Sequence, residues 1–182
     1  MGYVKTYRNS KNVMNPAEVG IYSQTSLGNT ATLSWVYSST SSGRTVRIPC
    51  KAGTRYIIKP YGDALSSSIW RIATTSSDDI PNGTTGPSTV PVQTIVSSNT
   101  PPINGTYMWT GSSVKYIVVQ ITSATYTDID DLKTMIALYE VSGEGETTPP
   151  TCEPYNTIGW YDWIKRKTNS GWTDGNSEKA PF

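Results

Sequence analysis

Apolar and polar residues alternate one by one along most of this chain. A period of two is typical of β-strands that bury one face. The strand at 116–121 is apolar on both sides, so we expect it at the centre of a sheet, buried on at least one side. The alternation predicts strands at residues 31–37, 44–49, 54–60, 68–74, 92–98, 107–109, 116–121 and 134–141.

Glycine marks the bends between several of these strands. Residues 50–53 predict a short turn in which Gly53 takes a positive φ angle, so the strands on either side are expected to form a hairpin. Asn104-Gly105 predicts a second tight turn. The pattern around Asp131 and Leu132 does not decide between strand and helix. A short helical turn there would have Asp128 as its candidate cap.

Evenly spaced short strands with almost no helix predict an all-β protein, an antiparallel β-sandwich or jelly roll of two stacked layers. We assign this sandwich to residues 12–141, after an N-terminal arm at 1–11. Residues 142–151 are rich in Gly, Pro and Glu, which is typical of a linker. Residues 152–182 form a short C-terminal tail in which aromatic residues are concentrated.

Composition narrows the chemistry. The formal net charge is +1, which does not favour a nucleic-acid binder. The absence of histidine excludes a Ser-His-Asp triad and a histidine-ligated zinc ion. No apolar run is long enough to cross a bilayer, and the first residues lack the apolar core of a secretory signal. The chain is therefore expected to be cytoplasmic, assembled in the cytoplasm, or a fragment of a longer protein.

The two cysteines, Cys50 and Cys152, lie far apart in sequence. Two such residues without histidine do not make a zinc site. Reduced thiols are the favoured interpretation. A disulfide that ties the end of the main domain to its own body is the alternative.

Four stretches resemble a β-sandwich module of phage and prophage structural proteins from Gram-positive bacteria: "NVMNPAEVGIYSQTSLGN", "RIPCKAGTRYIIKP", "SIWRIATTSSDDIP" and "VKYIVVQIT". Ile48-Pro49, Lys51 and Gly53-Thr54 match the central signature of these galactose-binding-type modules, as do Tyr56 to Ile58. Cys50 and Ala52 depart from it. The resemblance covers about residues 12–158.

This resemblance implies a non-enzymatic virion protein of the tail, a fibre or the capsid decoration, assembled in the host cytoplasm. Its sandwich would attach to glycans on the host surface or decorate the particle. The expected partners are other virion proteins, further copies of the chain and bacterial cell-surface polysaccharide, with neither nucleic acid nor membrane insertion. Alternatives are a purely structural virion component, or an accessory module of an extracellular bacterial enzyme.

A saccharide site needs a flat ring beside planar polar groups. Our candidates are Tyr61, Arg71, Asp79 and Trp109, which lie in strands and loops of the predicted sandwich. The alternatives are core packing for Trp109, as for Trp70, and an ordinary outward charge for Arg71. A glycosidase needs two acids flanking one cleft, and the acids here cluster in turns and in the linker.

No cofactor is expected, unless a structural calcium ion is bound by Asp128, Asp130 and Asp131. A solvated acidic turn or helix cap is the simpler explanation of these three carboxylates. Their loop lacks the glycine and glutamate of a helix-loop-helix calcium site.

The tail holds Trp160, Trp163, Ile164 and Trp172 beside a run of cations. So small a segment cannot bury three indole rings by itself, so it either folds back onto the sandwich or docks on another subunit. An assembly contact is the first interpretation and a sugar platform the second. Stacking on single-stranded nucleic acid would need a second basic patch, which the chain lacks.

Overall fold

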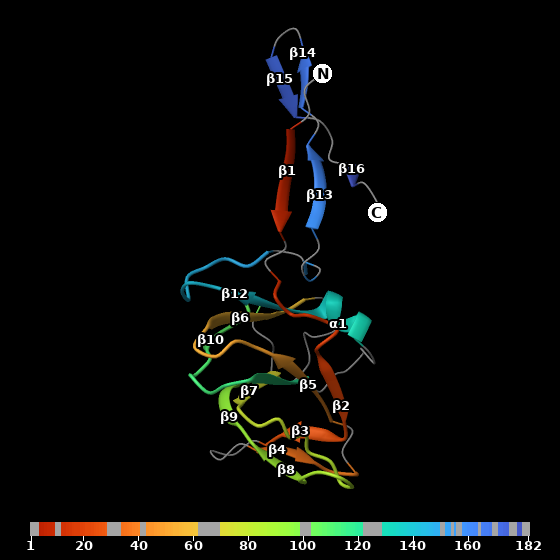
Figure 1. Ribbon diagram of the computed structural model, residues 1–182, viewed down its shortest axis with the longest axis vertical. Coiled ribbons are helices and arrows are strands. Elements are labelled where there is room, and N and C mark those ends of the chain that lie inside the picture. Colours follow the sequence, from red (N-terminus) through yellow and green to blue (C-terminus); the bar gives the residue numbers. More distant parts are fainter. Residues whose placement is uncertain are drawn as a thin grey trace.

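The computed structural model describes residues 4–9, 12–28, 34–40, 43–61, 70–98, 103–121, 129–149, 152, 153, 155, 158–163, 165–168, 171–174, 178 and 179. Strands and one short helix make up its regular structure (Figure 1). Their bounds are β1 Val4–Asn9, β2 Gly20–Ser23, β3 Thr25–Leu27, β4 Ser34–Tyr37, β5 Arg44–Pro49, β6 Arg55–Pro60, β7 Trp70–Thr75, β8 Thr89–Pro91, β9 Gln93–Ser98, β10 Thr106–Trp109, β11 Tyr116–Ile121, α1 Ile129–Met135, β12 Ile136–Glu140, β13 Ile158–Trp163, β14 Lys165–Thr168, β15 Gly171–Asp174 and β16 Glu178–Lys179.

Three antiparallel sheets stack to form the body of the protein (Figure 1). The outer sheet has the order β10-β6-β12, the middle sheet β2-β5-β11-β7-β9 and the small sheet β3-β4-β8. None of them closes into a barrel. The predicted all-β antiparallel sandwich is therefore confirmed, but with three layers where the sequence suggested two.

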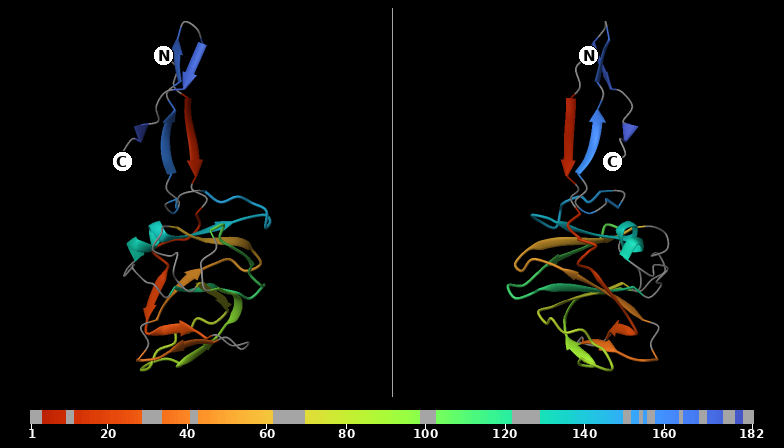
Figure 2. Two further views of the ribbon diagram at one scale, coloured as in Figure 1. Left: turned by 180° about the vertical axis from the view of Figure 1, so that it is seen from behind. Right: turned by 45° about the vertical axis from the view of Figure 1, so that its right-hand side comes forward.

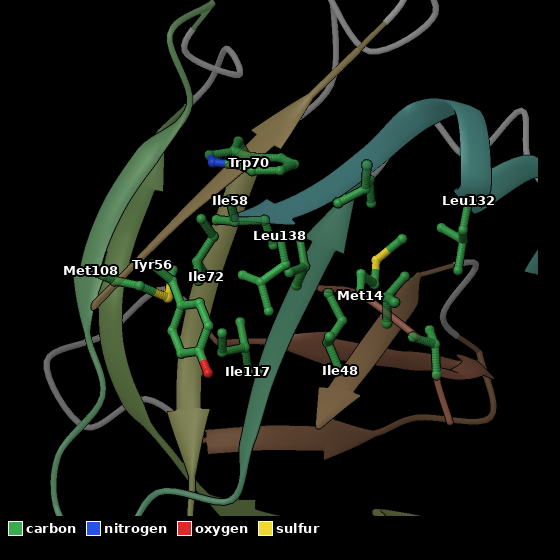
Figure 3. Packing of buried hydrophobic residues seen from close by; sticks show 14 residues of the cluster. Met14, Ile48, Tyr56, Ile58, Trp70, Ile72, Met108, Ile117, Leu132 and Leu138 are labelled. Carbon is green, nitrogen blue, oxygen red and sulfur yellow. The ribbon is translucent and has the colours of Figure 1, made fainter. Parts of the chain in front are cut away.

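The main hydrophobic core lies between the outer and middle sheets (Figure 3). Tyr56 and Ile58 of the outer sheet and Ile117 and Val119 of β11 all belong to it and are almost completely buried. Trp70 is also buried there, and its indole Nε1 donates a hydrogen bond to Thr106 Oγ1 at 2.9 Å. The core-packing interpretation of Trp70 is thus confirmed.

A second core lies between the middle and small sheets, and it makes β11 apolar on both faces. Val118 and Ala73 of the middle sheet pack there with Trp35 and Val90 of the small sheet. The expectation that β11 is a central strand is confirmed, since it pairs with β5 on one side and β7 on the other. A strand buried on both faces cannot alternate with polar residues, which explains its sequence.

The turn at residues 50–53 does not close a hairpin, so that prediction was wrong. Gly53 has the expected positive φ of 65°, but β5 belongs to the middle sheet and β6 to the outer sheet. Val46 of β5 and Ile58 of β6 lie in the same core cluster, where they face each other across the sandwich. The turn is held instead by Thr110, which accepts a backbone hydrogen bond from Gly53 at 2.9 Å.

The ambiguous acidic segment forms α1, which leads directly into β12. Residues 134 and 135 belong to the helix rather than to the strand predicted at 134–141. Leu132 is fully buried in the main core, so packing fixes the helix there. Asp130 and Asp131 occupy the first turn, where carboxylates favour the positive end of the helix dipole.

The N-terminal arm and the C-terminal tail form a stalk that projects from the side of the outer sheet (Figures 1 and 2). We define the stalk as β1 with β13 to β16. β1 pairs antiparallel with β13 over its whole length, from Val4 opposite Trp163 to Asn9 opposite Ile158. The two segments that the sequence left separate are therefore one structure. The tail begins on the body, at Cys152 and Glu153, and its residues 158–163 then pair with the arm as β13.

Asn12 joins the stalk to the body. Its side-chain Oδ1 accepts hydrogen bonds from the backbone N–H groups of Met14 at 3.0 Å and Leu138 at 3.1 Å. Its Nδ2 donates to the carbonyl oxygen of Glu153 at 2.8 Å. One buried amide thus holds the chain before β2, the strand β12 and the start of the tail. It fixes where both ends of the chain leave the body.

Replacing Asn12 by Ala is expected to destabilise the protein by about 2–4 kcal/mol, because buried donors and an acceptor lose their partner. Urea unfolding followed by circular dichroism measures the loss. Asn15→Ala is the matched control, since the Asn15 side chain accepts a hydrogen bond from the exposed N–H of Ala17 in its own turn and its loss should cost about 0.5–1 kcal/mol. Equal losses in the two variants would contradict the role of Asn12.

Candidate functional site

The outer face of the outer sheet turns away from both cores. Because side chains alternate along a strand, Tyr107 and Trp109 of β10 share this face with Arg55, Ile57 and Lys59 of β6. The register pairs Trp109 with Arg55 and Tyr107 with Ile57. This face therefore presents two aromatic rings along β10, beside two cationic side chains and one apolar side chain along β6.

A segment after β12 crosses this face, and we call it the strap (residues 142–149). At one end Arg55 Nη1 donates to the carbonyl oxygen of Ser142 at 3.4 Å. At the other end Lys59 Nζ and Tyr61 Oη both donate to the carbonyl oxygen of Pro149, each at 3.0 Å. The strap was interpreted from its composition as a linker. The strap runs along β6, since its two ends bond to opposite ends of that strand. In Figure 1 it is the light-blue loop on the stalk side of the sheet.

A groove of about 490 Å³ lies between the strap and β10. Its floor includes Ile57, and Tyr107 stands on the β10 side. The Asn104-Gly105 turn closes it at the start of β10, and Gly105 has the positive φ, 82°, that this turn was predicted to need. The complete lining is Ile57, Lys59, Asn104, Gly105, Tyr107, Glu144, Gly145, Glu146, Thr147 and Thr148. These residues offer hydroxyl, amide, carboxylate and ammonium groups to a small polar ligand.

Trp109 is the most notable side chain on this face, because 61% of its surface is exposed. Core packing was one interpretation of this residue, and its exposure shows that interpretation to be wrong. Trp109 follows Tyr107 by two positions on the same face, so its ring stands beyond the end of the groove. A large exposed ring next to a polar groove is the arrangement from which a saccharide site is built.

Tyr61 lies at the opposite end of β6 and is buried. Its hydroxyl is 2.7 Å from that of Tyr139, and both rings pack against Val141 and Cys152. Burial raises the pKa of Tyr61 to about 12 and raises the pKa of Tyr139 as well. In this position Tyr61 anchors the strap and the start of the tail.

Arg71 lies on the middle sheet beneath the small sheet. Its Nη1 donates to the carbonyl oxygen of Leu27 at 2.8 Å, and Gln120 accepts from the N–H of the same residue at 2.8 Å. The two side chains thus take up both backbone polar groups of Leu27. The interpretation of Arg71 as an ordinary outward charge is wrong, because the unpredicted third layer covers this face.

Asp79 lies in the exposed loop before β8 and shares hydrogen bonds with Ser77. The four candidate residues therefore occupy four different places. Trp109 is on the outer face, Tyr61 under the tail, Arg71 between two sheets and Asp79 in a loop. The structure does not bring them together, and Trp109 alone borders the groove.

Asp78, next to Asp79, belongs to a cluster that sequence reasoning missed. It forms an ion pair with Lys115 and accepts a hydrogen bond from Tyr116 Oη at 3.0 Å. The hydrogen bond from Lys115 lowers the pKa of Asp78. The Arg47 guanidinium lies 4.3 Å from the centre of the Tyr116 ring and donates to the Asp78 carbonyl oxygen at 3.1 Å. These groups satisfy one another, so the cluster holds the loop.

Cys50 and Cys152 are both free thiols, so the disulfide alternative is wrong. Cys50 packs against the main core and Cys152 against the buried tyrosine pair. Burial raises the pKa of Cys50 to about 12 and that of Cys152 to about 11. A thiolate is the reactive form of cysteine, so neither residue is prepared as a nucleophile.

No group of three possible metal ligands occurs among the described residues, and the calcium site, whose candidates include Asp128, stays a prediction. Asp128 lies outside the described residues. Asp130 forms an ion pair with Lys133 on the exposed side of α1. Asp130 and Asp131 therefore act as first-turn residues of the helix.

The stalk holds the predicted assembly residues. Trp160 lies opposite Tyr7, and Trp163 opposite Val4, in the β1–β13 ribbon. Trp172 is opposite Lys167 in the β14–β15 hairpin, and Ile164 lies outside the described residues. The register places aromatic residues at neighbouring positions of both strands.

Sequence reasoning missed Tyr107 and the strap residues of the groove. The signal for Tyr107 was present, since the predicted strand at 107–109 places it on the face of Trp109. Glu144 had no such signal, because a segment rich in Gly, Pro and Glu resembles a linker whether or not it folds over a sheet.

Comparisons with protein-family models, curated proteins and solved structures found no match to this chain. Within the residues that the structure describes, no helix is both long and apolar enough to cross a membrane.

The buried tyrosine pair predicts that stability falls at high pH. The pKa of Tyr61 is raised above its ordinary 10.0, so the folded state keeps the neutral phenol while the unfolded state ionises first. The stabilisation is complete below about pH 10 and is lost between about pH 10 and pH 12. Urea unfolding at about pH 8 and about pH 11 should show a smaller decrease in the Tyr61→Phe, Tyr139→Phe double variant than in the wild type. An equal decrease in the stability of both proteins would contradict the role of the tyrosine pair in this pH dependence.

Proposed function

We propose that this protein is a non-enzymatic virion component that attaches to saccharides through the outer face of its outer sheet. The exposed Trp109 beside the groove is the observation that carries the proposal. The flat ring matches the apolar face of a pyranose, and the groove supplies polar groups for its hydroxyls. The sequence resemblance to phage structural sandwiches supports the same class of protein.

The proposed role is binding rather than cleavage, because of how the acids of the groove are placed. Glu144 and Glu146 both belong to the strap, and the backbone N–H of Glu146 donates to the carbonyl oxygen of Gly143 in the same turn. Glycoside hydrolysis needs carboxyl groups on both sides of the scissile bond. Two acids on one wall fit a site that accepts hydrogen bonds from a ligand.

The stalk supports the virion and assembly part of the proposal. Both ends of the chain leave the body at one place and pair, so the sandwich becomes a head on a projecting ribbon (Figure 2). Beyond the short pairing of β13 with β16, the β1–β13 part of the stalk has only two strands, and a two-stranded ribbon is marginally stable alone in water. Other copies of the chain, or other virion proteins, would stabilise it by packing on its aromatic positions. Several heads on one assembly would also raise the avidity of a weak sugar site.

A purely structural virion protein is the second candidate function, and one observation favours it. The strap lies on the side of the body from which the stalk projects (Figure 1), and strap residues line the groove. A face turned toward the stalk is also placed to contact the particle. In that case Trp109 would contact protein instead of saccharide.

Trp109→Ala is expected to weaken binding to host cell-wall polysaccharide by about tenfold or more, because a large buried ring contributes about 1.5–3 kcal/mol. A glycan array and a polysaccharide pulldown measure the change. Trp109→Tyr should retain part of the binding, since it keeps a ring. Tyr37→Ala is the control, because it removes an aromatic side chain from the small sheet. If no saccharide binds the wild type, the structural function is favoured instead.

Removing the stalk is expected to convert an oligomer into a monomer. The deletion variant lacks residues 1–11 and residues 156–182. Cys152 and Glu153 are kept because they contact the body. Size-exclusion chromatography with light scattering gives the mass of each form. Circular dichroism confirms that the head remains folded. If the full chain is already a monomer and binds no partner, the assembly role of the stalk is wrong.

A further inference from the structure

Three charged side chains line the groove, and two of them are already engaged. Lys59 Nζ donates to the Pro149 carbonyl oxygen at 3.0 Å and lies 4.9 Å from the centre of the Tyr61 ring. Glu146 Oε1 accepts hydrogen bonds from the N–H and the hydroxyl of Ser142. Both groups therefore serve the shape of the strap. Neither has its full bonding capacity left for a ligand.

Glu144 is the third charged group, and it differs from the other two. It is exposed and lines the groove. Among the residues that the structure describes, no hydrogen bond or ion pair involves its carboxylate. Gly143 and Gly145 flank it, and a Cβ atom added at either would meet no atom within 4 Å. The Glu144 carboxylate is thus a solvent-exposed group at the wall of the groove.

The second cation on this face, Arg55, is not among the residues that line the groove. Arg55 lies on the same face beside Trp109, and its Nη1 donates to the carbonyl oxygen of Ser142. The unused group at the groove is therefore an acceptor. A carboxylate accepts hydrogen bonds and donates none, so its ligand must supply donors. Hydroxyl groups of a saccharide supply them. The lining carries two carboxylates, Glu144 and Glu146, against one ammonium, Lys59, so it disfavours a carboxylate or phosphate on the ligand.

From these contacts we propose that the groove selects an uncharged, hydroxyl-rich saccharide, with Glu144 accepting its hydroxyl groups and Trp109 stacking on its ring. The selection excludes acidic saccharides. This inference rests on the saccharide-binding function proposed above and adds the chemical class of the ligand. Hydrogen bonds to an ionised acceptor are about twice as strong as neutral ones, so Glu144 contributes to affinity as well as to selection.

The test uses pairs of oligosaccharides that differ in one group, neutral hexose oligomers and the matching uronic acid oligomers. The full-length wild type is expected to bind the neutral member at least about tenfold more tightly. Glu144→Gln should weaken neutral binding by about tenfold, since it loses the charge-assisted hydrogen bonds. Glu144→Lys should bind the uronic acid member better than the wild type does. Glu18→Gln, which removes an exposed carboxylate away from the groove, should change neither affinity.

The outcomes separate this inference from the proposed function. If binding depends on Trp109 but shows no preference for neutral oligomers, the proposed ligand class is wrong and the saccharide function stays in place. The same conclusion follows if Glu144→Gln has no effect on binding. Binding of no saccharide by the wild type overturns both. Thermal unfolding of each Glu144 variant should match that of the wild type, because the Glu144 carboxylate makes no hydrogen bond or ion pair among the residues that the structure describes.

Discussion

The burial of the middle sheet on both faces is the constraint on which the rest of this structure depends. β11 lies at its centre, and its side chains pack alternately into the core below the outer sheet and the core above the small sheet. Polar groups in such a sheet must find partners within the protein. Gln120 and Arg71 do so on Leu27, and this bonding attaches the small sheet. With its inner face committed to the main core, the outer sheet leaves only its other face for a ligand.

That outer face is shaped by a segment that has no regular secondary structure. The strap is held at Arg55 and at the pair Lys59 and Tyr61, so it runs along β6 and leaves a groove beside β10. Beyond the strap, Cys152 packs on the tyrosine pair and Glu153 bonds to Asn12, where the stalk begins. The groove wall and the base of the stalk are therefore one continuous piece of chain. The binding face and the assembly segment that we propose therefore share one structural support.

Much of the fold was predictable because it follows from local rules. Alternation identified β5, β6, β7 and β11, and glycine identified the turns at Gly53 and Gly105. The hairpin prediction failed at residues 50–53 because a short turn can join neighbours in one sheet or strands in two sheets, and alternation is the same for both. Trp70 and Trp109 show the same limit of the alternation pattern, which does not say which face of a strand is buried. Each sits in a strand beside polar residues, yet one is buried and the other 61% exposed.

The sequence by itself determined an all-β antiparallel architecture, the central position of β11, and the lack of histidine chemistry, because these depend on residue type and on a period of two. Only the tertiary structure decided the third layer, the groove under the strap, and the pairing of the two ends of the chain. Those features join segments that lie far apart in the sequence: 93 positions separate Leu27 from Gln120, 90 separate Lys59 from Pro149, and 141 separate Asn12 from Glu153. No local pattern specifies such partners, since the free energy that selects them comes from surfaces that meet only after the chain has folded.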